Sequence, residues 1–372
     1  MANVIASLTT DALENTSEVN SLDGFVITPS TMGFLNITEQ QSAINGRYFA
    51  LGTSISRSLR YETSNDKLTA DANGRKYVEF HSLQIYTDGT GVSQNQSVHL
   101  MSINGSATQS QLGMYTTADP VQSGVSRLAA RFRDLGISTG TQVVFMEDTP
   151  ALADGAVLYT VTRMYSQSAA GAEDGGAEIW VNGVLGFAKY DVSWFSDDDF
   201  SWPETLESRY FVNGGSGANK GVRDFVVLDG WSSDPETPPP YLQVRDLPVS
   251  SLTAADYTGV GDASTDLEAL NDVDDTTYLT TNVPESVLSL SFGAGLNNPD
   301  VVGFEVRSRV ARGGLDDNTI DLGLKNGGAV IDNANRTLVA IGGARDVFNY
   351  VFDLNNTVYK LDDLSVEFTN GS

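Results

Sequence analysis

Two glutamates in the stretch E-D-G-G-A-E, Glu173 and Glu178, have a type and spacing that could support a reaction. Two carboxyl groups about 5 Å apart can cleave a glycosidic bond, one as nucleophile and the other as acid and base. A separation of five residues places the side chains on opposite faces of a flat strand, unless Gly175 and Gly176 form a bulge. We therefore expect both glutamates to be solvated, and we predict no catalytic residue.

The two histidines, His81 and His99, both lie in strand-like runs. A Ser-His-Asp site or a zinc site would need partner residues at suitable spacing, and neither run supplies them. We expect both histidines to be ordinary strand residues. The glycine-rich segment 214–221 lacks the G-K-[ST] ending of a phosphate loop, so it is interpreted as a plain loop.

Acidic clusters offer the carboxylate oxygens that calcium prefers. Neither cluster has the regular D-x-D-x-D-G spacing, so both are interpreted as solvated loops, with the second kept as a calcium candidate. Apart from calcium, no cofactor is expected. The first cluster consists of Asp197, Asp198 and Asp199, and the second of Asp272, Asp274 and Asp275.

Three tryptophans are candidates for stacking on a sugar ring, because aromatic side chains combine an apolar face with a polar edge. The alternative is that they belong to a sandwich core or to a subunit interface. The residues concerned are Trp194, Trp202 and Trp231, with Phe195 and Phe200 nearby.

These candidates must be positioned by β-strands, since short apolar runs recur about every ten residues between Asn-Gly, Asp-Gly and Gly-Gly pairs. One segment, 123–136, has apolar residues near a period of 3.6 and predicts a short amphipathic helix. The expected strands include residues 46–52, 76–86, 98–105, 141–148 and 156–165.

The stretch A-E-I-W-V-N-G-V-L-G-F-A-K-Y, residues 177–190, predicts a β-hairpin. Asn182 and Gly183 can adopt the positive φ angles that a type I′ turn needs. A period of two places Glu178 and Trp180 on one face of the strand and the residues between and after them on the other.

The chain of 372 residues is long enough for two domains. A composition break at D-P-E-T-P-P-P-Y predicts a semi-rigid spacer, because consecutive prolines favour extended geometry. We predict an N-terminal arm at 1–22, a β-sandwich at 23–235, a Pro-rich linker at 236–248 and a second, smaller sandwich at 249–372.

The formal charge of −26 would repel phosphate backbones and anionic lipids, so nucleic acid and membranes are not expected partners. The absence of cysteine rules out disulfides and thiolate sites. No signal peptide and no apolar stretch of about 20 residues is recognisable.

The segments I-W-V-N-G, R-Y-F-V-N-G-G-S-G (209–217) and V-R-D-F-V-V-L-D-G (222–230) resemble the closing strands of concanavalin A-like, laminin-G-like sandwiches. This resemblance covers about residues 23–235. It implies that the first domain has that fold.

The second half is similar to the two-sandwich structural proteins of tailed bacteriophages, and also to discoidin-type jelly rolls. Val358 and Tyr359 replace a tryptophan that is frequent in the phage proteins near the final strand. The segments that carry the similarity are Y-L-Q-V-R-D-L-P-V (241–249), L-N-D-V-D-D-T-T-Y-L-T-T (270–281), G-F-E-V-R-S-R-V-A-R (303–312) and K-L-D-D-L-S-V-E-F (360–368).

The expectation is an all-β protein with two tandem β-sandwich (jelly-roll) domains, the first concanavalin A-like. The resemblance implies a non-enzymatic virion structural protein, such as a capsid decoration, fibre or tail-associated component, made in the host cytoplasm. Its partners would be other virion proteins and copies of itself. The alternative is a glycan-binding adhesin or depolymerase that attaches to a host-surface glycan.

Overall fold

The structure is a computed structural model in which the chain divides into two compact units, Met1–Val244 and Arg245–Ser372. The division falls inside the segment 236–248 that was predicted as a linker. The structure describes residues 2–8, 25–28, 34–37, 46–50, 57–64, 67–86, 97–103, 110–133, 141–152, 156–169, 171–194, 205–212, 220–242, 244, 247, 249–254, 256–261, 265–271, 278–281, 283–292, 298–310, 318–338, 346–355 and 357–371.

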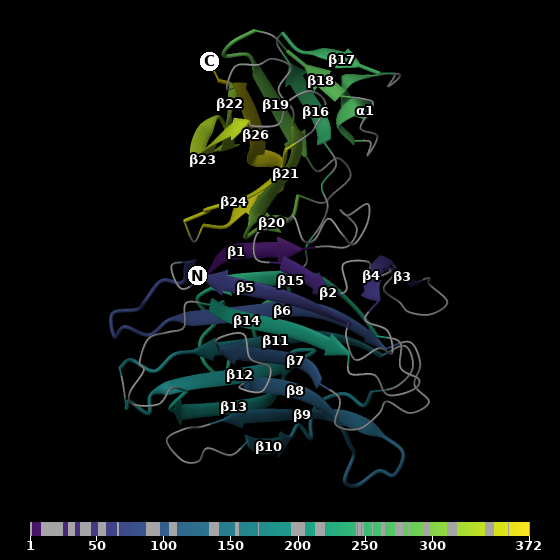
Figure 1. The fold of residues 1–372 in the computed structure, drawn as a ribbon, viewed down its shortest axis with the longest axis vertical. Coiled ribbons are helices and arrows are strands. Elements are labelled where there is room, and N and C mark those ends of the chain that lie inside the picture. The colour runs from purple at the N-terminus through teal and green to yellow at the C-terminus, as the bar shows by residue number, and fades with distance from the viewer. Residues whose placement is uncertain are drawn as a thin grey trace. The chain divides into compact units, whose positions relative to one another are not determined.

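The first unit is a β-sandwich of two antiparallel sheets (Figure 1). The eight-stranded sheet contains, in spatial order, β13 (Val184–Val192), β12 (Gly175–Val181), β11 (Ala156–Tyr165), β6 (Tyr77–Tyr86), β15 (Lys220–Asp229), β4 (Gly46–Ala50) and β3 (Phe34–Ile37), with β1 (Asn3–Leu8) also paired to β15. The seven-stranded sheet contains β10 (Thr141–Phe145), β9 (Ser126–Arg133), β8 (Ser110–Ala118), β7 (Ser97–Ile103), β14 (Thr205–Val212), β5 (Arg57–Ser64) and β2 (Phe25–Thr28).

The main core lies between these two sheets, where apolar side chains from both are buried. Strand β9 contributes Leu128, Ala130 and Phe132, which alternate along the strand as a period of two requires. The helix predicted at 123–136 was therefore wrong. Leu128 and Phe132 fit both periodicities, and the pairing of β9 with β8 and β10 decides in favour of the strand.

The predicted N-terminal arm needs correction at its start, because Asn3–Leu8 form strand β1 within the first unit. This strand pairs antiparallel with β15, and Ala6 and Leu8 are buried in the main core. Burial of these two side chains explains why Asn3–Leu8 are part of the first unit. Residues 9–22 lie outside the described part of the chain.

The predicted hairpin at 177–190 is confirmed. Asn182 and Gly183 have φ angles of 50° and 78°, and they connect β12 directly to β13. Ile179 and Val181 are part of the main core, while the indole of Trp180 lies on the opposite face of the sheet.

The second unit is also all-β, with a core of its own. Its five-stranded sheet has the order β16 (Val249–Ala254), β19 (Val287–Phe292), β26 (Leu364–Asn370), β22 (Asn318–Asn326) and β23 (Ala329–Leu338). Three further pairs join β17 (Thr258–Val260) to β18 (Tyr278–Thr280), β20 (Asp300–Val301) to β25 (Tyr359–Lys360) and β21 (Phe304–Val310) to β24 (Asp346–Phe352). The described helices are α1 (Asp266–Asn271) and a 3₁₀ turn at Leu361–Asp363.

Candidate functional site

Charged side chains cross the face of the eight-stranded sheet that points away from the main core, which we call the outer face. Arg163 on β11 lies directly opposite Glu79 on β6 and directly opposite Glu178 on β12. Because paired residues of neighbouring strands point to the same face, the three side chains form one row. His81 lies on the same face of β6, two residues after Glu79.

These four side chains form a buried charged cluster, since each has an exposed fraction of 0%. The Nε atom of Arg163 lies 3.2 Å from Glu178 Oε2 and 3.9 Å from Glu79 Oε2. The Nε2 atom of His81 lies 2.5 Å from Glu79 Oε1. Pairing of this kind is needed to hold ionised groups inside a protein, because removal from water is costly for each charge.

The segment Trp231–Leu242, which we call the covering segment, lies on the outer face and provides further partners. Arg163 donates to the carbonyl oxygens of Ser233 at 3.0 Å and Thr237 at 2.7 Å. The amides of Ser232 and Glu236 donate to Glu79 at 2.9 Å and Glu178 at 2.7 Å. Residues 236–242 of the predicted linker are therefore packed on the first sandwich, because their backbone completes the shell of the buried charges.

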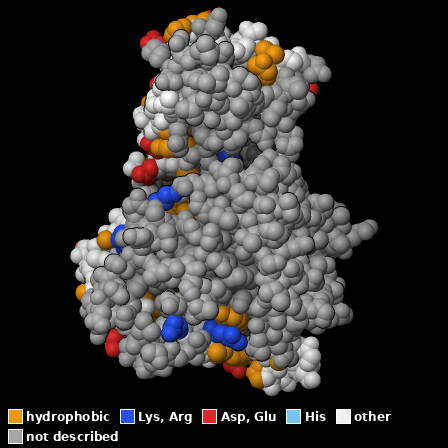
Figure 2. Space-filling view, viewed as in Figure 1, with side chains coloured by type: hydrophobic (Ala, Val, Ile, Leu, Met, Phe, Trp, Pro, Cys, Tyr) orange, Lys and Arg blue, Asp and Glu red, His pale blue; other side chains and the backbone are white. Residues whose placement is uncertain are grey.

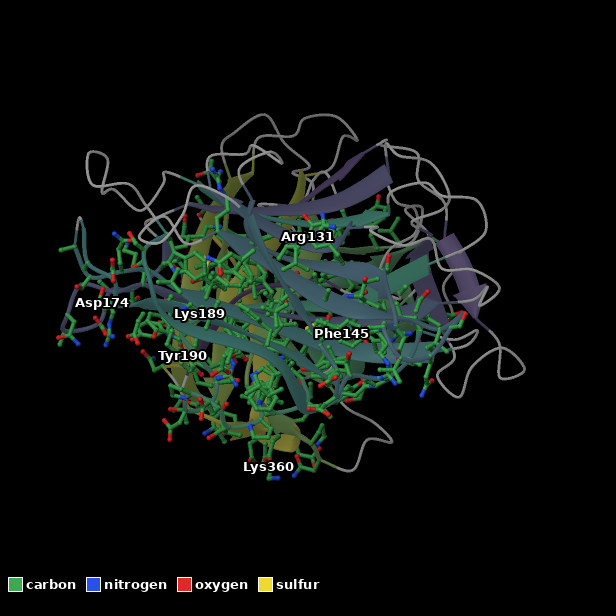
Figure 3. The ribbon with its side chains drawn as sticks, turned by 90° about the horizontal axis from the view of Figure 1, so that it is seen from below. Arg131, Phe145, Asp174, Lys189, Tyr190 and Lys360 are labelled. Carbon is green, nitrogen blue, oxygen red and sulfur yellow. The ribbon has the colours of Figure 1, made fainter. Side chains whose placement is uncertain are left out.

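The surroundings shift the pKa of Glu79 in the cluster and of the neighbouring Tyr190. Burial alone would raise the pKa of Glu79, but hydrogen bonds from His81 and Ser232 hold it below its usual value. Burial and the hydrogen bond to the Glu178 carboxylate raise the pKa of the Tyr190 hydroxyl. Figure 3 shows the side chain of Tyr190, which belongs to β13. The cluster therefore favours the ionised form of the Glu79 carboxylate.

Aromatic side chains close one end of the cluster. The ring of Trp231 contacts the rings of Tyr77 and Tyr165 edge to face, at centroid distances of 5.9 and 5.2 Å. The guanidinium of Arg163 lies 4.9 Å from the Trp231 ring, as in a cation–π pair. Burial raises the pKa of Tyr165 to about 12. These contacts of Trp231 thus hold the start of the covering segment against the outer face.

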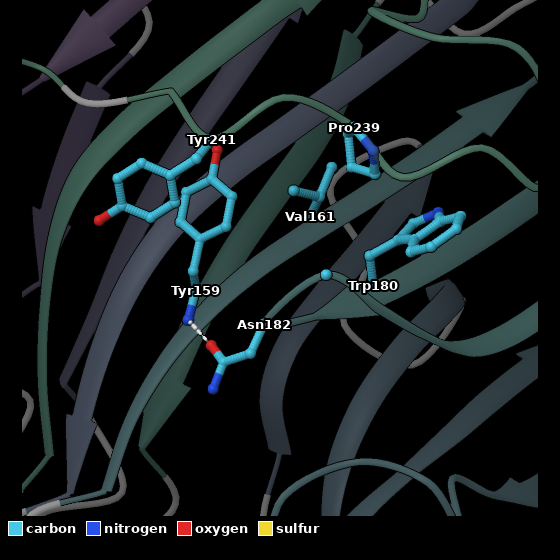
Figure 4. A pocket seen from close by; sticks show the side chains of 7 residues that line it. Tyr159, Val161, Trp180, Asn182, Pro239 and Tyr241 are labelled. Atoms are coloured by element: carbon cyan, nitrogen blue, oxygen red, sulfur yellow. Dashed lines mark hydrogen bonds between the residues drawn. The ribbon is translucent and has the colours of Figure 1, made fainter.

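A pocket of about 350 Å³ lies between the 182–183 turn and the covering segment (Figure 4). The rings of Tyr159 and Tyr241 lie against each other on one side, with centroids 4.2 Å apart, and Trp180 lies on the other side. Tyr241 is 55% exposed, whereas Tyr159 and Trp180 are buried. The lining residues are Tyr159, Val161, Trp180, Asn182, Gly183, Pro239 and Tyr241.

Hydrogen bonds fix the walls of this aromatic pocket. The amide of Tyr159 donates to Asn182 Oδ1 at 2.7 Å, and the Asn182 side chain donates to Val157 O at 3.2 Å. The Tyr159 hydroxyl accepts from the amide of Leu242 at 2.7 Å and also contacts Nδ1 of His81. None of the lining residues that the structure describes is charged, so they can offer ring faces and neutral polar groups to a ligand.

The structure separates the two glutamates that the sequence suggested as a pair. Glu173 is exposed before β12, whereas Glu178 is completely buried, so the expectation that Glu178 is solvated was wrong. Strand β12 places the Glu178 side chain between Arg163 and the covering segment. An irregularity does occur at Gly175/Gly176 in the pairing of β12 with β13.

The other sequence candidates are placed as follows. Trp194 is buried in the main core and donates to Tyr165 O at 2.9 Å, so it is a core residue. Trp231 lies at the covering segment, and His99 lies in β7. Trp202, Phe195, Phe200 and all six aspartates of the two acidic clusters lie outside the described residues.

Within the described ranges, no group of three or more His, Asp or Glu side chains is arranged to hold a metal ion. In the same ranges, no helix has the length and apolar character needed to cross a bilayer.

Sequence reasoning missed Glu79, Arg163 and most of the pocket. A signal was present, because Glu79 and His81 alternate with apolar residues in V-E-F-H, and Arg163 interrupts an apolar run. Charges at alternating positions in a strand that is otherwise apolar on both faces indicate a covered polar face. Tyr159 and Tyr241 are 82 residues apart in the numbering, so their contact follows only from the fold.

No protein-family model matches the sequence, and no curated protein matches it. Several solved structures are similar in fold. An endo-β-1,4-glucuronan lyase from the fungus Trichoderma reesei is 12% identical, over 62% of this chain and 97% of that chain, with a TM-score of 0.33. A carbohydrate esterase from the Shiga toxin-encoding bacteriophage phi24B is 11% identical, over 62% and 100%, with a TM-score of 0.36. An alginate lyase from a Chlorella virus is 11% identical, over 61% and 100%, with a TM-score of 0.38.

The sheets of the chain itself show the predicted all-β class. The comparisons bear on one other expectation. The prediction that the chain is not an enzyme was wrong in its premise, which took tandem sandwiches as a sign of an inert structural protein. The solved structures to which the chain is similar include polysaccharide lyases and a carbohydrate esterase. Their activities are properties of those proteins, and the likeness itself concerns the fold.

Proposed function

We propose that the first unit binds a neutral glycan in the aromatic pocket, which is the alternative function considered from the sequence. The observation that carries this proposal is the exposed ring of Tyr241, held against Tyr159 at the mouth of an uncharged pocket. A sugar ring has an apolar face of C–H groups, and such a face packs well on an exposed aromatic ring.

The size and stiffness of the pocket suit a small ligand unit. A volume of about 350 Å³ falls at the lower end of the range, roughly 300–1,000 Å³, that is usual for small-molecule sites. The covering segment holds Pro239 and Tyr241 through backbone bonds to buried charges, so little conformational freedom remains to be lost on binding.

The charge distribution favours neutral over acidic sugars. None of the seven lining residues is a lysine or arginine that could pair with a carboxylate or sulfate. The chain as a whole carries a formal charge of −26, which repels polyanions. We therefore expect uncharged hexose or pentose polymers to bind, and uronate or sulfated polymers to bind much more weakly.

Calorimetric titration of the whole chain with neutral and acidic oligosaccharides tests the proposal, after an array has identified the best neutral ligand. Tyr241→Ala should weaken binding about 5- to 30-fold, since a stacked ring contributes roughly 1–2 kcal/mol. Tyr278→Ala, which changes an exposed tyrosine of the second unit, is the matched control and should bind like the wild type. Equal affinity of Tyr241→Ala and wild type would reject the pocket as the site.

A second candidate function, cleavage of the bound glycan, is favoured by one specific observation. Glu79, His81 and Tyr159 contact one another in series, and the ring of Tyr159 lines the pocket. A carboxylate that orients an imidazole, which in turn contacts a hydroxyl, is a general arrangement for moving a proton. The hydroxyl is bonded to Leu242, so the covering segment would have to shift before a substrate reached it.

Product analysis after incubation with the bound glycan tests this second candidate. Turnover should be lost in Tyr159→Phe while the affinity is largely kept, because only the hydroxyl is removed. Turnover that survives this change would exclude Tyr159 as the proton carrier.

The association with a tailed-phage particle that the sequence resemblance implies also stays a prediction. Mass spectrometry of purified particles should find the chain at many copies per virion, and its absence from the particles would remove this prediction.

A further inference from the structure

The two sheets of the first unit end in edge strands that differ in how well they are protected against pairing with another chain. Strand β13, at the end of the eight-stranded sheet, carries Lys189 and Asp191, and Asp191 has a φ angle of 56°. Its pairing with β12 is irregular at two places. Charges and bulges of this kind hinder the addition of a further strand.

Strand β10 has none of these features. Its sequence, T-Q-V-V-F, contains no charge, glycine or proline, and its register with β9 runs without interruption from Thr141 to Phe145. Among the described strands it is the last of its sheet. An uncharged, regular edge strand exposes backbone donors and acceptors that a further strand can use.

Two adjacent valines of β10 are exposed, one on each face. Val143 is 60% exposed and lies opposite Arg131, on the solvent side of the sheet. Val144 lies opposite the fully buried Ala130, so it points to the core side, and yet it is 40% exposed. The edge of the core beside β10 is thus partly exposed to solvent. Figure 2 shows hydrophobic side chains at the surface beside Lys and Arg side chains near β8 to β10.

The charges at the two ends of β10 favour a second copy of this chain as the pairing partner. Arg133 lies opposite Thr141 at the start of the strand, and the exposed residues Glu147 and Asp148 follow its end. If two copies of β10 pair antiparallel, the acidic end of each lies beside the basic end of the other. A twofold axis produces this favourable contact twice, whereas parallel pairing would bring like charges together.

We propose that β10 pairs antiparallel with β10 of a second copy of this chain about a twofold axis near Val143, so that the seven-stranded sheets of two molecules become continuous. The dimer covers both exposed valines and the exposed edge of the core. This surface is separate from the aromatic pocket, so dimer formation and glycan binding can be tested independently.

Analytical ultracentrifugation of the whole chain over a concentration series tests the association. The wild type should dimerise reversibly, Val143→Lys should remain monomeric, and Val121→Lys should dimerise like the wild type. Val121 is the matched control because it is a valine with 84% exposure in a turn. Circular dichroism and the melting temperature should show that both variants are folded.

The chain contains no cysteine, so a single introduced thiol reports on the pairing register. Val143→Cys should form a disulfide-linked dimer on mild oxidation, because paired residues near a twofold axis have Cα atoms about 4.5–5.5 Å apart. Val121→Cys should not crosslink. A wild type that stays monomeric throughout, or crosslinking that is equal for the two cysteine variants, would overturn the proposal.

Discussion

The two faces of the eight-stranded sheet are both buried, but different interactions stabilise them. The inner face packs apolar side chains such as Leu158 and Met164 against the other sheet. The outer face carries Glu79, Arg163 and Glu178, which are paired with one another and with the backbone of the covering segment. The inner face therefore depends mainly on packing, whereas the outer face combines an apolar cluster that includes Val161 and Trp180 with this row of paired charges. The paired charges also position a wall of the aromatic pocket.

Removal of the central cation should give the largest effect. Arg163→Met leaves Glu79 and Glu178 buried without their positive partner, so we expect a loss of about 3–5 kcal/mol in the free energy of unfolding at neutral pH. Met164→Ala, the neighbouring residue on the inner face, should cost about 2–5 kcal/mol through a cavity.

Chemical denaturation at several pH values distinguishes the two faces. The loss caused by Arg163→Met should shrink in acid, because the unpaired carboxylates can then take up protons, while the loss caused by Met164→Ala should not depend on pH. A pH-independent loss for Arg163→Met would mean that Arg163 stabilises the outer face through packing and not through its charge.

Glu79 should make the stability of the first unit sensitive to acid. Its pKa is lower in the folded protein than the ordinary value of 4.5, so its contribution is complete above that value. The contribution is lost as the pH falls through the folded-state pKa. Glu79→Gln should be less stable than the wild type at neutral pH and should show a shallower fall below about pH 4.5. Parallel acid-unfolding curves for the two proteins would contradict this role.

Ser233→Ala should have the smallest effect, about 1 kcal/mol, because it removes a hydroxyl that accepts from Arg163 and donates to Thr237 O. Hydrogen exchange should become faster in residues 231–242 and remain unchanged in the strands. Ser250→Ala, which removes a hydroxyl bonded to Ser291 O in the second unit, is the control. Unchanged exchange in the covering segment would mean that its backbone contacts hold it without Ser233.

The same contrast explains which features the sequence could predict. The hairpin at Asn182 and the strands β6 and β11 follow from turn chemistry and from a period of two, which are local properties. The row Glu79–Arg163–Glu178 depends on the order and register of three strands, and β6 is distant in the sequence from the other two, so no local pattern specifies the row. The prolines at 238–240 indicated an extended segment, but only the buried charges beneath explain why that segment lies on the sheet.

The most direct test of the account is an NMR titration of the whole chain with the best neutral oligosaccharide. We predict that the largest backbone shift changes occur at Asn182, Gly183 and Tyr241, with smaller changes along the covering segment. Shift changes confined to other regions, or none at saturating ligand, would contradict a glycan site in the aromatic pocket.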